Sequence, residues 1–128
     1  MQNQEFIPAQ KNSVERLKVP PHSMEAEQSV LGSMLFDPES WDKVTELVME
    51  SDFYNRSHQI IYSHILQLLG QNKPIDLVTV SESLEQHDLL HEAGGFAYLG
   101  ELAKNTPSSA NVTAYAQIIK ERAITREL

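Results

Sequence analysis

Residues 23–36 read SMEAEQSVLGSMLF and carry the clearest helical pattern in the chain. The pattern steps by three and four through Met24, Glu27 or Gln28, Leu31 and Leu35. This spacing predicts a helix over residues 24–36, for which Ser23 is a favourable N-cap residue. A glycine inside a helix costs about 1 kcal/mol relative to alanine. We therefore expect another helix to approach closely at Gly32.

Two further helices are expected before residue 71. Asp37-Pro38 is typical of a helix start, because a carboxylate caps the first turn and proline lacks the N–H that this turn leaves unpaired. The apolar residues that follow are Trp41, Val44, Leu47 and Val48, and we expect Trp41 to be a core anchor. A third helix is predicted between Ser57 as its cap and Gly70 as its C′ residue. Its apolar residues are Ile61, Ile65, Leu68 and Leu69.

Three more helices complete the pattern. Asp76 can cap the fourth, although TVSE at residues 79–82 spells a capping box and allows a later start. Gly94-Gly95 interrupts the chain before a short fifth helix, whose expected inward residues are Phe96, Leu99 and Leu102. The sixth helix opens near Asn111, and its apolar residues are Val112, Tyr115, Ile119 and Ala123.

The fold class follows from the absence of any alternating pattern of strand length. We expect an all-α domain of about six helices. Its expected parts are a flexible arm (residues 1–22), a helical body (23–110) and the start of a long helix (111–128). The helical pattern is still running at residue 128, so we interpret the sequence as the N-terminal part of a longer protein.

Charge is distributed unevenly along the 128 residues. The net charge is −8, and residues 23–103 alone hold fourteen acidic and three basic residues, a net of −11. The flanking segments are weakly basic, at +1 for residues 1–22 and +2 for residues 104–128. Because nucleic-acid affinity rests largely on neutralising phosphates with lysine and arginine, this charge argues against direct DNA binding by the body.

Motifs that would indicate an enzyme are missing from the sequence. It holds no cysteine, no phosphate-binding glycine-rich loop, no G-x-S-x-G and no H-E-x-x-H. His87 and His91 have the spacing of metal ligands on a helix, but they fall at a helix end, and we interpret them as exposed side chains. No apolar stretch approaches the ~18 residues of a membrane span, and the first twenty residues lack a signal peptide. A cytosolic helical interaction domain is the interpretation that remains.

Several ordered blocks resemble the bacterial replicative DNA helicase family, DnaB. They are VPPHSMEAEQSVLG at 19–32, DFY at 52–54, PIDLVT at 74–79, GGFAYL at 94–99, TPSSANV at 106–112, and YA with IIKER at 115–122. The resemblance covers about residues 17–128. It implies an N-terminal domain in which six copies form a collar as a trimer of dimers, with the last helix continuing into a linker hairpin.

The resemblance also implies partners and cofactors. The collar docks the C-terminal domain of primase, with a replication initiator or helicase loader as a further partner, and single-stranded DNA is bound only by the full ring. ATP, Mg²⁺ and the 5′–3′ helicase activity belong to a RecA-like domain after residue 128, so no catalytic or metal residue is expected here. Tyr98, Ile118 and Ile119 are the candidate partner-contact residues. The implied location is the cytoplasm, at the nucleoid.

One alternative from another class stays open at this point. An independent helical regulator that binds nucleic acid would also be all-α, and the segment around residues 57–87 has the look of a helix-turn-helix. A helix-turn-helix protein that binds DNA needs a basic recognition helix. Residues 77–87 contain Glu82 and Glu85 and no lysine or arginine.

Overall fold

The computed structural model describes residues 19–106 and 109–128, and within them it contains six α-helices and no strand. The helices are α2 (Met24–Phe36), α3 (Glu39–Thr45), α4 (Arg56–Gly70), α5 (Leu77–Gln86), α6 (Gly95–Asn105) and α7 (Val112–Glu127). Two 3₁₀ turns, η1 (Glu50–Asp52) and η2 (Ser109–Asn111), join them. The all-α prediction is confirmed. None of the helices in the described residues is long and apolar enough to cross a membrane.

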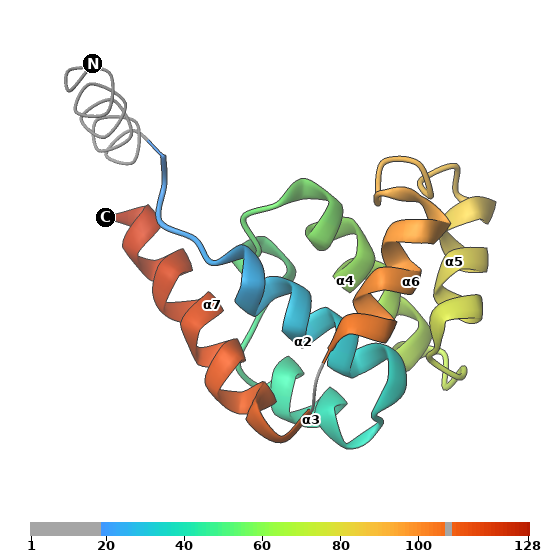
Figure 1. The fold of residues 1–128 in the computed structure, drawn as a ribbon, viewed down its shortest axis with the longest axis horizontal. Helices are drawn as coiled ribbons and strands as arrows, with labels where there is room; N and C mark the ends of the chain where they lie inside the picture. Colours follow the sequence, from blue (N-terminus) through green and yellow to red (C-terminus); the bar gives the residue numbers. More distant parts are fainter. Residues whose placement is uncertain (1–18, 107–108) are drawn as a thin grey trace, which may run out of the picture.

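Helix α2 lies at the centre of the fold (Figure 1), with α7 along one side and α6 along the other. Eight of its thirteen residues are buried. The apolar ones, each at most 3% exposed, are Ala26, Val30, Leu31, Met34 and Leu35. Residues 23–36 therefore determine the fold because the other helices pack around this one.

The expected close approach at Gly32 is confirmed. A Cβ atom there would lie 1.7 Å from the Thr106 hydroxyl oxygen and 2.3 Å from the Leu102 carbonyl oxygen of α6. Glycine lets the two backbones meet without a side chain between them. A second glycine is required at the start of α6, where Gly94 has φ 108° and a Cβ would lie 2.6 Å from the ring of Tyr98.

Helix caps agree with the sequence at the starts of α2 and α5 and differ at the start of α4. Ser23 accepts a hydrogen bond from the amide of Ala26, and Asp76 accepts one from the amide of Thr79. The expected Ser57 cap is wrong, since Asn55 is the N-cap of α4 and accepts from the amide of Ser57. The predicted C′ glycine is also wrong. Gly70 is the last helical residue, and the left-handed conformation (φ 56°) falls two residues later, at an asparagine.

The second helix is shorter than its apolar pattern predicts. Helix α3 ends at Thr45, because the chain beyond it is bound by other elements. The Val48 carbonyl accepts the hydroxyl of Tyr62, and the Met49 amide donates to the carboxylate of Asp52. These bonds take the place of helical ones and draw the chain into η1.

Two expected core aromatics are less buried than predicted. Trp41 is half-buried against the core, and its indole N–H donates to the Met34 carbonyl. Phe96 is 54% exposed, so its assignment to the inward face is wrong. Tyr98 shares that face with Leu99 and Leu102. At 3.6 residues per turn, the centre of the face formed by these three residues lies more than a quarter of a turn around α6 from Phe96.

Residues 19–22 run against the last turns of α7 (Figure 1). Arg122 donates to the carbonyl of His22, and Arg126 donates to the carbonyl of Pro21. The His22 ring stacks on Tyr54 at 4.1 Å, and the Arg126 guanidinium lies 5.5 Å from the centroid of the same tyrosine. Residues 1–18 of the predicted arm lie outside the described residues.

Candidate functional site

A buried carboxylate lies at the centre of the polar interior. Glu27 on α2 is 1% exposed and accepts hydrogen bonds from the backbone amides of Tyr54 (2.8 Å) and Asn55 (3.4 Å). Its third partner is the Nδ1 atom of His58 on α4, at 2.7 Å. Because a buried charge is tolerated only when it is fully hydrogen-bonded, Glu27 fixes the loop before α4 against α2.

The network continues from His58 to the half-buried Tyr98 on α6. The His58 ring is 0% exposed, its Nε2 atom lies 2.5 Å from the Tyr98 hydroxyl oxygen, and the two rings stack with centroids 5.9 Å apart. The side-chain amide of Gln28 donates to the same hydroxyl at 3.2 Å. With a neutral imidazole all bonds run one way: Gln28 donates to Tyr98, Tyr98 to His58, and His58 to Glu27.

The chemistry of this network is structural. Burial raises the pKa of the Tyr98 phenol, the bond from Gln28 lowers it, and the nearby charges of Glu27 and Glu101 raise it. The phenol therefore stays neutral at physiological pH and serves as a hydrogen-bonding group, not as a base or a nucleophile. We name these four residues (Glu27, Gln28, His58 and Tyr98) the interhelical network, since they join α2, α4 and α6.

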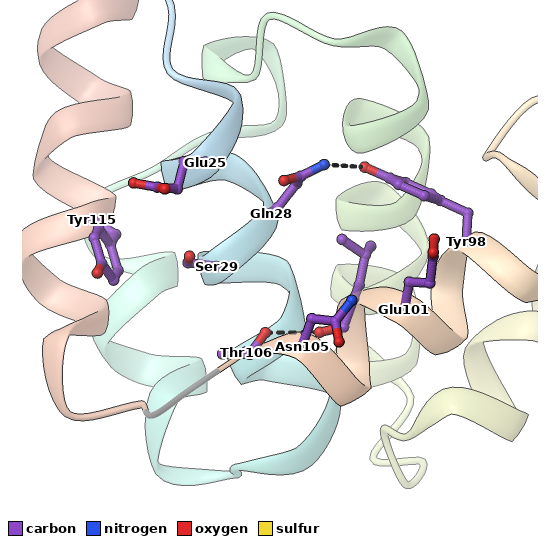
Figure 2. A pocket seen from close by; sticks show the side chains of 9 residues that line it. Glu25, Gln28, Ser29, Tyr98, Glu101, Asn105, Thr106 and Tyr115 are labelled. Carbon is purple, nitrogen blue, oxygen red and sulfur yellow. Dashed lines mark hydrogen bonds between the residues drawn. The ribbon is translucent and has the colours of Figure 1, made fainter.

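A pocket of about 440 Å³ opens beside the network, between α2, α6 and α7 (Figure 2). It is lined by Glu25, Gln28, Ser29, Tyr98, Glu101, Leu102, Asn105, Thr106 and Tyr115. Gln28 and Tyr98 belong to both features, so the outer end of the network forms one wall of the pocket. This volume is in the usual range for ligand sites, roughly 300–1,000 Å³.

The three sequence-predicted contact residues lie in different surroundings. Tyr98 lines the pocket. Ile118 is half-buried, and Ile119 is 2% exposed within the core. The structure thus places Tyr98 at an accessible site, separates it from the isoleucines of α7, and leaves the side chain of Ile119 almost no free surface. Their contacts with a partner stay predictions.

Sequence reasoning did not predict the bond between Glu27 and His58, the two buried members of the interhelical network. A signal for Glu27 was present, because an acidic side chain occupied a step of the apolar pattern of residues 24–35. His58 gave no such signal. As predicted, His87 and His91 are both exposed. Among the described residues no group of three or more histidine, aspartate or glutamate side chains is placed to hold a metal ion.

Fold and site together define a small all-α domain with an open polar pocket, and comparison with known proteins identifies its family. The family model of the DnaB-like helicase N-terminal domain matches residues 19–121. This chain belongs to that family.

Individual relatives agree with this assignment. The chain is 50% identical over 117 residues to the replicative DNA helicase DnaB of Buchnera aphidicola (91% of this chain, 25% of the relative). It is 41% identical over 128 residues to the same protein of Haemophilus influenzae (100% and 27%). The chain thus spans about a quarter of the length of these relatives. The crystal structure of the DnaB N-terminal domain from Mycobacterium tuberculosis superimposes with a TM-score of 0.83 at 42% identity, covering 86% of this chain and 76% of that one.

Proposed function

We propose that this domain is the collar of a hexameric replicative helicase and that it mediates subunit association and docks primase during DNA replication. The supporting relatives are replicative helicases about four times as long as this chain. In the proposed protein, ATP, Mg²⁺ and 5′–3′ unwinding belong to the remaining part, in the bacterial cytoplasm at the nucleoid, and single-stranded DNA is bound only by the full ring.

The observation that carries the primase proposal is the setting of Tyr98. Its ring lines an open pocket, and its hydroxyl is held by both Gln28 and His58. An aromatic side chain held in one position loses little conformational entropy on binding, and aromatic residues are common binding hot spots. Tyr98 therefore has the properties of a preorganised partner contact.

The charge of the surface favours a protein partner over nucleic acid. Lys120 pairs with Asp52 at 2.8 Å. The other two basic side chains of α7, Arg122 and Arg126, bind carbonyl oxygens of residues 21, 22 and 52. The basic residues of this helix are engaged within the fold, which speaks against an independent regulator that binds nucleic acid.

Subunit association is proposed for α7 and the helical hairpin expected to follow it. Ile118 is half-buried on this helix, and Ile124 is 54% exposed. In a full-length protein these apolar side chains are available to pair with a neighbouring copy. Light scattering of full-length protein carrying Ile124→Asp tests this: we expect loss of the hexamer, and an intact hexamer would contradict it.

The primase proposal is tested by calorimetric titration of the primase C-terminal domain into this domain. We expect Tyr98→Ala to weaken binding by about 1–3 kcal/mol. Tyr98→Phe keeps the ring but removes the hydroxyl that Gln28 and His58 hold, so it should weaken binding less than Tyr98→Ala does. The matched control is Val78→Ala, because Val78 is 61% exposed on α5, away from the pocket lining. Circular dichroism confirms that each variant is folded. Wild-type affinity in a folded Tyr98→Ala variant would contradict the proposal.

A further inference from the structure

Two carboxylates in the pocket have no counter-ion among the residues that the structure describes. Glu25 from α2 and Glu101 from α6 both line it, both are exposed, and neither forms a salt bridge within the described residues. The carboxylate of Glu27, by contrast, is hydrogen-bonded within the protein, to the Tyr54 amide and to His58. The carboxylates of Glu25 and Glu101 therefore give the pocket a negative charge that no salt bridge within the described residues neutralises.

The remaining lining suits a cation that carries an apolar stem. Figure 2 shows the ring of Tyr115 on the side of Glu25 and the ring of Tyr98 on the side of Glu101, with Asn105 between the helices below. Aromatic faces attract guanidinium and ammonium groups, and carboxylate and amide oxygens accept their hydrogen bonds. The apolar stem of such a side chain can pack against Leu102.

Preorganisation of one wall adds to this match. The Tyr98 ring is fixed by bonds to Gln28 and His58, so it does not have to be ordered when a ligand enters. The pocket, at about 440 Å³, is of a size for one long side chain with its hydration rather than for a folded segment.

We propose that this pocket receives a basic side chain from the surface of the docked partner protein, and that this side chain is an arginine. Arginine fits better than lysine because its planar group can stack on tyrosine while it bonds a carboxylate. This inference rests on the proposed docking function and adds the chemistry by which the partner is recognised.

A small probe tests the pocket without any partner. N-acetyl-arginine amide is titrated into ¹⁵N-labelled domain, with the neutral isostere N-acetyl-citrulline amide as the comparison. We expect saturable shifts of the Tyr98 and Glu101 amides, and affinity about tenfold higher for the arginine probe. The Glu25→Gln/Glu101→Gln variant should bind the two probes equally. The matched control Glu85→Gln/Glu92→Gln, which removes two exposed charges outside the pocket lining, should behave as wild type.

The same variants are then titrated with the primase C-terminal domain. We expect Glu25→Gln/Glu101→Gln to weaken binding about tenfold and to reduce its salt dependence. Equal binding of arginine and citrulline probes by wild type overturns the inference. Normal primase binding by the pocket variant also overturns it and leaves the docking function intact. If the arginine probe binds selectively but primase does not bind wild type, the pocket chemistry is supported and the primase proposal fails.

Discussion

The Nε2 atom of His58 on α4 lies 2.5 Å from the hydroxyl oxygen of Tyr98 on α6, and the planes of the two rings differ by only 10°. Through this contact the buried Glu27 on α2 is connected to the wall of an open pocket. A side chain proposed to contact a partner is thereby held by the polar interior of the domain. Stability and docking are expected to be coupled at this one tyrosine.

The first prediction concerns the Tyr98 hydroxyl. Tyr98→Phe leaves the ring in place but removes a bonding partner from His58 and Gln28. We expect the free energy of unfolding to fall by about 1–3 kcal/mol, the cost of an unsatisfied buried polar group. Urea denaturation measures this. Tyr115→Phe is the control, since in the described residues the Tyr115 hydroxyl forms no hydrogen bond, and an equal loss there would contradict the argument.

The second prediction concerns Glu27. Glu27→Ala removes the acceptor of two backbone amides and of the buried His58 ring. We expect a loss of about 3–5 kcal/mol, as for breaking a buried polar pair from one side, measured by denaturant unfolding. Glu25→Ala, two residues earlier and exposed, should change stability by less than about 0.5 kcal/mol. Comparable losses in the two variants would show that the network does not stabilise the fold.

The third prediction uses two glycines as a matched pair. Gly32→Ala places a methyl group 2.3 Å from the Leu102 carbonyl oxygen, and α2 and α6 must separate. We expect a loss of at least about 2 kcal/mol despite the better helix propensity of alanine. At Gly70 no atom of the described residues lies within 4 Å of an added Cβ, so Gly70→Ala should be neutral or stabilising by up to about 1 kcal/mol. Thermal unfolding that ranks the two variants in the opposite order would refute the close packing.

The fourth prediction is a pH dependence that originates at His64. Burial lowers the pKa of this imidazole, the charge of His87 lowers it further, and Glu50 raises it in part. Below the ordinary histidine pKa of 6.5 the unfolded chain therefore binds the proton more readily than the folded one. The stability contributed by neutral His64 is present above that pH and is lost as the pH falls through the lowered value.

His64→Gln tests this assignment. The amide cannot take up a proton in this range, and we expect the slope of unfolding free energy against pH below 6.5 to be flatter than in wild type. NMR titration of the His64 ring in the folded wild type measures the lowered pKa directly. A variant slope as steep as that of wild type would assign the effect to another group.

The sequence by itself determined the helices and several of their ends. The three- and four-residue spacing from Met24 to Leu35 placed α2, Ser23 and Asp76 capped their helices as expected, and Gly32 marked the crossing with α6. These features depend on residues within one or two turns of each other or on the absence of a side chain, and such local rules are visible in the order of amino acids.

The tertiary structure alone decided the interhelical network and the pocket. Glu27 and His58 are 31 residues apart, and His58 and Tyr98 are 40 apart. No local rule connects residues so distant. The tertiary structure also decided that helix α3 ends at Thr45, because the hydrogen bonds that replace further helical ones come from Tyr62 and Asp52. An acid, an imidazole and a phenol are ordinary polar side chains in the sequence. They become a unit only when folding removes them from water together and leaves each as the other's hydrogen-bond partner.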